Sequence, residues 1–495
     1  MTKRTETLII SAMILGIFMA SLDNTIVSAS INQVIKDIGG FEQMSWVFTA
    51  YILASTSTML VFGKLSDIYG RKLFFLTGIV LFLLGSALCG MAQNIDQLIF
   101  YRTIQGVGSG ALLPISFTII FSIFTDPTKA AKMTGIFAGV FGLSSVLGPQ
   151  LGTWISEGLS WRWCFYVNLP LGILSFLILF FALIETKSNL KPKIDYLGTI
   201  LLITTTIAVM LAFEWGGKKY DWSSTVILGL FGVFTVGIIL FIFTEKRAKE
   251  PILPLHLFKD KVISGTSFIV FCQGVLMFSA ITYIPILAVG VLGRHGSNGL
   301  LTPMMLSLMA GASLGGILMT KFSFRTFYLF VMGMGIVTSG LLFMVGPDTP
   351  FFEVVLLMIL LGSCGIGPLM SVAQNAVANT IPKQYLGIAN SLVAFFRNLG
   401  GIFGASIMAT IVNNYVQQQM TGKGSFSNPD ALLQEQSSLQ IPAPVLHVLR
   451  GVLSDAIGHG FLFALIVCGI GFIISMFIGN ARFTYKGEKE KATEV

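Results

Sequence analysis

The chain has 495 residues, of which 54% are hydrophobic and only 11% are charged, and its mean hydropathy is +0.82. Because soluble domains carry about 25% charged residues, this composition excludes an ordinary soluble protein and places the chain in lipid. A net charge of +8 would suit an anionic partner such as nucleic acid, but the basic residues follow the pattern of membrane orientation. The five cysteines have no paired spacing, which favours small core residues over disulfides or metal ligands.

Apolar runs long enough to cross a bilayer, which takes about 20 residues, recur along the whole chain. We expect fourteen spans with short connections, as in a helical bundle. Their approximate ranges are 8–32, 44–62, 74–92, 97–121, 132–155, 163–184, 196–214, 222–243, 262–288, 298–320, 325–345, 352–372, 386–413 and 456–479. The first run follows two basic residues as a signal peptide would, but it is too long for one and is kept as a span. The exception among the connections is a long loop, rich in Gln and Ser, at 414–455.

The distribution of basic residues predicts the orientation of these spans. With the N-terminus inside, most of the 31 Lys and Arg residues fall in the inside connections and few in the outside ones. This is the positive-inside pattern, and the even number of spans agrees with it, so both termini are predicted to be cytoplasmic. The same loops suit anionic lipid headgroups, so nucleic-acid binding is not needed to explain the charge.

A carboxylate, Asp23, lies near the middle of the first span. A charge at that depth costs roughly 2.5–3.5 kcal/mol on insertion scales, so it is rare without a function or a partner. Arg102, in the fourth span, would be as costly if it were unpaired. The first span runs outward and the fourth inward, so both residues are expected in the outer half, where they can pair. The alternative for Arg102 is snorkelling to the outer interface, because it lies close to the start of its span.

The connection after the second span reads Gly63-Lys64-Leu65-Ser66-Asp67-Ile68-Tyr69-Gly70-Arg71-Lys72. Its glycines permit a tight turn, and Asp67 can sit near a helix terminus or pair with a basic neighbour. This stretch resembles the G-x-L-x-D-x-x-G-R-[KR] motif of the major facilitator superfamily, where the loop is a conformational latch. The resemblance implies that Gly63, Asp67, Gly70, Arg71 and Lys72 act in gating rather than in substrate contact.

Two helix motifs resemble the same superfamily. The stretch from Arg102 to Gly108 is similar to its R-x-x-Q-G-x-G motif, in which the arginine is tied to proton transfer. The fifth span contains Gly148-Pro149-Gln150-Leu151-Gly152-Thr153, which resembles the G-x-x-x-G-P-x-x-G-G motif of antiporters, with Thr153 where a second glycine is usual. From the residues alone, Gly148 and Gly152 would serve close helix packing and Pro149 a bend. The resemblance implies antiport.

The stretch from Trp161 to Gly172 is an aromatic interface belt and is very similar to the W-R-W-x-F-x-x-N-x-P-x-G motif of the fourteen-helix drug:proton antiporter branch. The first span adds the L-D-x-T-[IV]-V signature of that branch. The resemblance covers nearly the whole chain and implies an all-α membrane protein with the major facilitator fold. It implies an N-terminal six-helix bundle (1–194), two additional spans with a cytoplasmic linker (195–261) and a C-terminal six-helix bundle (262–495).

Glu214, beside Trp215 at the end of the seventh span, has two interpretations. It is either a structural carboxylate at the outer interface or a second protonatable or cation-attracting group. Exchange of one proton for one monovalent cation moves no net charge, so the membrane potential would contribute only if a second proton moved. Arg397, in the thirteenth span, is expected in a helix interface or an inner vestibule and is not assigned to substrate.

We therefore predict a transporter, not an enzyme, in the bacterial cytoplasmic membrane. It would export hydrophobic and often cationic compounds, such as dyes, antibiotics and antiseptics, in exchange for protons. Asp23 would carry the proton and meet cationic substrates, with Arg102 favouring its charged form, and Glu214 would act with it. No cofactor or metal is expected, and the chain would work as a monomer without nucleic acid. The alternative is a major facilitator transporter of one specific metabolite or ion, since a fold does not fix a substrate.

Overall fold

The computed structural model describes residues 3–40, 43–124, 126–184, 194–294, 296–420 and 443–479. Within these ranges the regular elements are helices, apart from an isolated bridge between Gly216 and Tyr220. Fourteen helical segments of the described chain are long and apolar enough to cross a membrane. The predicted all-helical architecture with fourteen spans is therefore confirmed.

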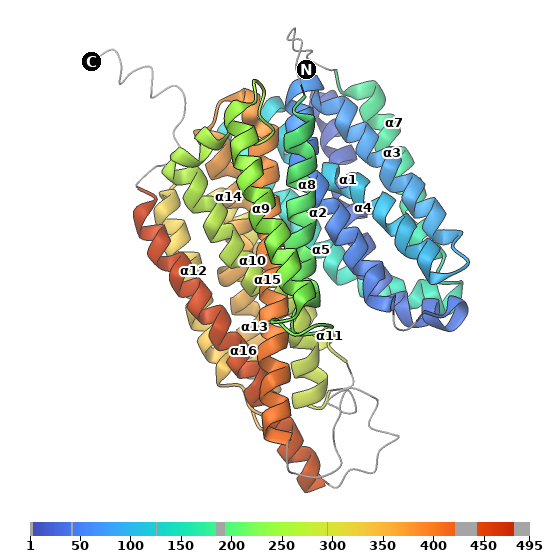
Figure 1. The fold of residues 1–495 in the computed structure, drawn as a ribbon, viewed down its shortest axis with the longest axis vertical. Helices are drawn as coiled ribbons and strands as arrows, with labels where there is room; N and C mark the ends of the chain where they lie inside the picture. The colour runs from blue at the N-terminus through green and yellow to red at the C-terminus, as the bar shows by residue number, and fades with distance from the viewer. Residues whose placement is uncertain are drawn as a thin grey trace.

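The helices form two bundles with a helix pair between them (Figure 1). The first bundle contains α1 (Lys3–Ile38), α2 (Met44–Tyr69), α3 (Arg71–Gly90), α4 (Ile95–Ile123), α5 (Pro127–Gly158), α6 (Trp163–Tyr166) and α7 (Asn168–Ala182). The pair is α8 (Tyr196–Trp215) and α9 (Thr225–Arg247). The second bundle contains α10 (Lys261–Ile286), η3 (Leu287–Val291), α11 (Asn298–Leu318), α12 (Phe324–Phe343), α13 (Phe351–Leu360), η4 (Leu361–Ile366), α14 (Gly367–Thr380), α15 (Leu386–Met420) and α16 (Ala443–Phe477). Short 3-10 turns, η2 (Leu255–Lys259) and η5 (Lys383–Tyr385), precede α10 and α15.

The last two spans are longer than the hydropathy pattern indicates. We expected them to cover 386–413 and 456–479, but α15 continues to Met420 and α16 already begins at Ala443. Hydropathy marks only the part of a helix that lies in lipid, and a helix can continue into water with polar residues such as Asn413 and Gln417. Much of the expected loop 414–455 is therefore helical, and its central part, 421–442, lies outside the described residues.

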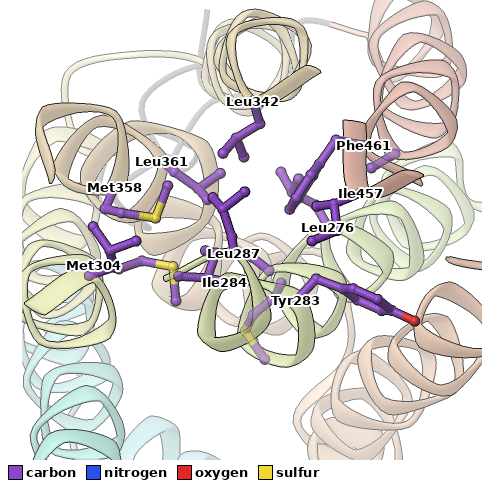
Figure 2. Packing of buried hydrophobic residues seen from close by; sticks show 14 of the residues in the cluster. Leu276, Tyr283, Ile284, Leu287, Met304, Leu342, Met358, Leu361, Ile457 and Phe461 are labelled. Atoms are coloured by element: carbon purple, nitrogen blue, oxygen red, sulfur yellow. The ribbon is translucent and has the colours of Figure 1, made fainter. Parts of the chain in front are cut away.

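Each bundle has its own apolar core. Figure 2 shows one cluster of the second bundle, in which Leu276, Ile284 and Leu287 of the α10–η3 span lie among side chains from α11, α12, α13 and α16. Lipid tails are as apolar as these side chains, so the hydrophobic effect adds little between helices in a membrane. Close van der Waals packing therefore holds the bundle together.

The two bundles contact each other through α2 and α4 against α15, and through α5 against α11 and α14. Among the hydrogen bonds that cross this contact, three are donated by an asparagine amide of the second bundle to a threonine hydroxyl of the first. They are Asn398 to Thr56 (3.1 Å), Asn390 to Thr118 (3.1 Å) and Asn375 to Thr134 (2.6 Å). The bundles are thus joined by polar bonds that can exchange partners without exposing a charge.

The helix pair α8 and α9 lies in front of the seam between the bundles in Figure 1. Helix α8 contacts both α2 and α15. Ser406 of α15 donates a hydrogen bond to the carbonyl of Phe213, and the indole of Trp222 donates one to the hydroxyl of Thr410 at 3.2 Å. The end of α8 that carries Glu214 is thereby fixed to both bundles.

Candidate functional site

Asp23 of α1 and Arg102 of α4 form an ion pair inside the first bundle. Nη1 of Arg102 contacts Oδ2 of Asp23, and both side chains are 0% exposed. The predicted pairing of the two intramembrane charges is therefore present, and Arg102 does not snorkel to the surface. Pairing removes most of the penalty that each charge would carry alone in a medium of low dielectric constant.

The second oxygen of the Asp23 carboxylate is held by two side-chain amides. Oδ1 accepts hydrogen bonds from Nε2 of Gln105 at 2.7 Å and from Nδ2 of Asn168 at 3.0 Å. Both amides also donate to the hydroxyl of Ser86, which itself donates to the carbonyl of Phe165 at 2.8 Å. The carboxylate therefore sits in a network that links α1, α3, α4 and the α6–α7 span.

Gln105 and Asn168 lie within the motif stretches Arg102–Gly108 and Trp161–Gly172, but no role was predicted for either, and Ser86 was not predicted at all. Gln105 lies one helical turn after Arg102, a spacing that puts both on one face of α4 and was a usable signal. Asn168 opens α7, the second part of the broken sixth span. Ser86 is one serine among many in apolar helices, and no pattern in the sequence marks it.

The guanidinium of Arg102 has further partners besides Asp23. Nε donates to the carbonyl of Val47 at 3.1 Å, Nη1 to Oε1 of Gln105 at 2.8 Å and Nη2 to Oδ1 of Asn24 at 3.4 Å. The ring of Tyr51 lies 4.1 Å from its central carbon, a distance suited to a cation–π contact. Because these partners are neutral, the arginine keeps hydrogen bonds if Asp23 becomes protonated.

Two glycines allow the helices around this network to approach closely. A Cβ atom on Gly106 would lie 2.5 Å from the carbonyl oxygen of Tyr51, and one on Gly85 would lie 2.5 Å from the backbone nitrogen of Gln105. Any larger side chain would push α2 or α3 away from α4 and lengthen the hydrogen bonds between them. The glycines of these helices thus set the distances within the network.

The antiporter-like motif on α5 packs directly against α1 beside Asp23. A side chain on Gly148 would overlap the hydroxyl of Thr25, and one on Gly152 would lie 2.5 Å from the carbonyl oxygen of Ile26. Pro149 lies inside the helix, and the exposed Thr153 donates to its carbonyl at 3.0 Å. The position where Thr153 replaces the usual glycine therefore faces outward and requires no close approach.

The segment predicted to be a loop, Gly63–Lys72, contacts the second bundle, but it is helical apart from Gly70, because α2 continues to Tyr69 and α3 begins at Arg71. Asp67 accepts hydrogen bonds from the backbone N–H groups of Gly387 at 2.8 Å and Ile388 at 3.0 Å. These groups open α15, where the helix dipole favours a negative charge. Arg71 donates to the carbonyl of Lys383 at 3.3 Å, and Gly70 adopts φ +109°, which favours glycine.

Three other residues of the segment Gly63–Lys72 fit the same arrangement. A side chain on Gly63 would overlap the hydroxyl of Ser391, so α2 and α15 touch at this point. Lys72 donates to the carbonyl of Phe180 at 2.6 Å and so stays within the first bundle. Lys64 is buried and lies 3.6 Å from Glu250, in the segment that follows α9. The segment Gly63–Lys72 thus touches the second bundle and the linker after the extra helices.

Glu214 lies apart from the Asp23 network, in a cavity of about 260 Å3 between α2, α8 and α15. Its Oε1 is 3.4 Å from the hydroxyl of Thr49 and 3.4 Å from Nζ of Lys218, and 27% of its side chain is exposed. The lining residues are Ser45, Phe48, Thr49, Ile52, Leu53, Met210, Glu214 and Ile402. The cavity therefore combines apolar walls with one acidic group.

The fourteen apolar helices of the described residues, with an ion pair enclosed among them, indicate a multi-pass membrane protein. The family model of the Major Facilitator Superfamily matches residues 13–405. The chain therefore belongs to the Major Facilitator Superfamily, a family of transporters and not of enzymes. This confirms the resemblance drawn from the sequence motifs.

The chain is similar to two transporters of Bacillus subtilis (strain 168). It is 38% identical to Multidrug resistance protein 3 over 498 residues, which cover 98% of this chain and 97% of that protein. It is 34% identical to Multidrug transporter protein MdtP over 527 residues, which cover 99% and 97%. Among solved structures, the human organic anion transporter MFSD10 shares the fold, with a TM-score of 0.60 at 12% identity and coverage of 94% of this chain and 99% of that one.

Proposed function

We propose that this protein is a proton-coupled multidrug antiporter that exports hydrophobic and often cationic compounds. The observation that carries the proposal is the buried pair of Asp23 and Arg102, the one ion pair of the described residues in which both side chains are fully buried. The names of the two Bacillus transporters support export of several compounds. The alternative, transport of one specific metabolite or ion, fits the fold equally and is separated by the experiment below.

In this proposal Asp23 carries the proton. Protonation of the carboxylate removes its charge and weakens its bonds with Arg102, Gln105 and Asn168, because hydrogen bonds to ionised groups are the stronger ones. Arg102 then relies on Val47, Asn24 and the ring of Tyr51. Breaking and re-forming the pair once in each cycle couples proton binding to the packing of α1 against α4.

Alternating access would come from rocking of the two bundles, 1–194 and 262–495, around the helix pair of 195–261. The basic residues predict that the termini and the loop with Asp67 face the cytoplasm. With that orientation the contacts of Asp67 to α15 and of Arg71 to η5 close the cytoplasmic side, and Asp23 is loaded from outside. Opening inward then requires these contacts to break, so the segment Gly63–Lys72 acts as a gate on the cytoplasmic side.

We assign Glu214 to attraction of cationic substrates rather than to proton transfer. A proton carrier has to be shielded from water between the two sides, but 27% of this side chain is exposed and Lys218 already lies beside it. The cavity around it is slightly smaller than the 300–1,000 Å3 typical of drug-sized ligands. A substrate would therefore widen it by displacing α8 from α2. Asp23 would meet a cation only after its pair with Arg102 opens.

We further propose that the protein works as a monomer in the bacterial cytoplasmic membrane, with protons and small molecules as its partners. To test coupling, purified protein is reconstituted in vesicles and proton flux is followed after addition of two chemically unrelated cationic dyes. Wild type should give proton flux with both dyes, and an uncoupler should abolish dye export. Asp23→Asn should give no dye-driven proton flux, and flux at the wild-type rate would refute the proposal. Flux with a single narrow class of compound would favour the alternative.

A further inference from the structure

Arg397 of α15 is a buried cation for which the proposed proton cycle gives no role. Only 4% of the residue is exposed. Its Nε donates to Oε1 of Gln273 at 3.3 Å, and its Nη2 is buried without a hydrogen-bond partner among the described residues. A guanidinium with five donors in a membrane interior is costly when these donors are left unsatisfied.

The surrounding helices fix the position of this guanidinium. Nε2 of Gln273 donates to the carbonyl of Ile366 at 2.7 Å, so the amide oxygen is left to face Arg397. Ile366 ends η4, a π-helical segment of the kind that often marks functional sites. Helix α10 also approaches α15 so closely that a side chain on Gly274 would overlap the carbonyl oxygen of Arg397. Gln273, itself fixed by η4, is therefore the hydrogen-bond acceptor of the guanidinium, and Nη2 is left buried without a partner among the described residues.

The second bundle provides no counter-charge for Arg397. Between residues 262 and 420 and between 443 and 479, the acidic residues are Asp348, Glu353 and Asp455, and all three are exposed. Asp23 of the first bundle is paired with Arg102, and Glu214 of α8 lies beside Lys218. None of the ion pairs among the described residues includes Arg397. The charge of Arg397 is thus uncompensated within the described residues, in contrast to the fully paired charge of Arg102.

We propose that Arg397 is the binding group for the carboxylate of zwitterionic or anionic amphipathic substrates. A guanidinium fork matches a carboxylate with two parallel hydrogen bonds, and this pairing is strong where water is excluded. The next residue, Asn398, bonds to Thr56 of α2, so this part of α15 lies where the two bundles meet. The proposal rests on the proposed export function and extends its substrates beyond cations, and it gives a role to Arg397, which the sequence did not assign to substrate.

The test uses two rhodamine dyes that differ in one group: a zwitterion with a free carboxylate and its ethyl ester, which is a cation. Fluorescence polarisation measures binding of each dye to purified protein in a chloride-free buffer without carboxylate ions, and vesicle assays measure export of each. The variants are Arg397→Gln, Arg397→Lys and the control Arg294→Gln, which changes an exposed arginine near the end of η3. Wild type should bind the acid more tightly than the ester.

In Arg397→Gln the Kd for the acid should rise about tenfold while that for the ester stays within about twofold. Arg397→Lys should keep part of the preference for the acid, and Arg294→Gln all of it. An unchanged preference for the acid in Arg397→Gln would overturn the proposal. Loss of binding of both dyes in both Arg397 variants would also overturn it, because it indicates a structural role. A third outcome would also overturn the proposal. If wild type binds both dyes equally, and chloride raises the thermal midpoint of wild type but not of Arg397→Gln, the residue binds an inorganic anion.

Failure of this inference can be told apart from failure of the proposed function. If wild type exports the ester with proton flux but does not prefer the acid, only the assignment of Arg397 is wrong. If wild type exports neither dye, multidrug export itself is wrong, and the assignment falls with it.

Discussion

Oδ1 of Asp67 accepts a hydrogen bond of 2.8 Å from the backbone N–H of Gly387, although 320 residues separate the two. The bond joins the end of α2 to the start of α15, and so ties one bundle to the other. The adjacent N–H of Ile388 donates to the other carboxylate oxygen at 3.0 Å. One side chain thus satisfies two of the backbone N–H donors that lack a partner within the helix at its N-terminus.

Asp67→Asn should loosen this contact, because the amide keeps one acceptor but turns an NH2 group toward a backbone donor. Loss of one charge-assisted bond is worth about 1.4 kcal/mol, or about tenfold in the open population. A cysteine placed at Ser391, which faces Gly63, reports opening through its reaction with an impermeant thiol reagent in inside-out vesicles. Labelling should rise about tenfold in Asp67→Asn and not in Asp96→Asn, at the opposite end of the bundle. Equal labelling in both would show that Asp67 does not hold the bundles together.

Removing one partner of the buried ion pair should destabilise the protein more than removing both. Arg102→Gln leaves the Asp23 carboxylate buried without its cation, which costs about 3–5 kcal/mol. The double variant Asp23→Asn, Arg102→Gln removes both charges, so most of the loss in thermal midpoint should be recovered. Transport should stay absent in both variants, because the proposed coupling needs the intact pair of Asp23 and Arg102. Additive losses in midpoint would mean that the two side chains do not stabilise each other.

Close packing of α4 against α2 should contribute to stability and transport, as the buried charges do. In Gly106→Ala the new Cβ would meet the carbonyl oxygen of Tyr51 at 2.5 Å, and overpacking of this kind typically costs about 1–3 kcal/mol. Gly229→Ala is a matched control, because nothing lies within 4 Å of the new atom on α9. The first change should lower the thermal midpoint and the rate of transport, and the second should leave both unchanged. Equal midpoints would contradict the tight packing described for this network.

Glu214→Gln should weaken export of cationic dyes without affecting uncharged drugs. The KM for a monovalent cationic dye should rise about 3- to 10-fold, as expected for loss of one partly exposed charge interaction, while the maximal rate stays the same. Lys218→Gln should act in the opposite direction, because it frees the carboxylate from its neighbour at 3.4 Å. Vesicles energised by a potassium diffusion potential alone provide the decisive comparison. If Glu214→Gln loses only the export that is driven by the membrane potential, Glu214 carries a second proton and our assignment is wrong.

Much of the architecture could be predicted from the sequence, because a bilayer demands long apolar helices and penalises charge. Asp23 and Arg102 stood out in the sequence for that reason. Their expected depths, in two spans that run in opposite directions, predicted that they would pair. The amide of Asn168 could not be found in this way, since it reaches Asp23 across 145 residues through packing of α7 against α1. The ends of α15 and α16 were missed because helices that leave the lipid no longer follow the apolar pattern.

We propose that Asp23 exchanges a proton for substrate, and this exchange can be measured without a membrane. Purified protein in detergent, in weakly buffered solution with a pH indicator, is mixed with a cationic dye that the transporter exports. We predict that wild type releases protons on binding the dye and that Asp23→Asn, although it remains folded by its thermal midpoint, releases none. Proton release of equal size from Asp23→Asn would contradict the account.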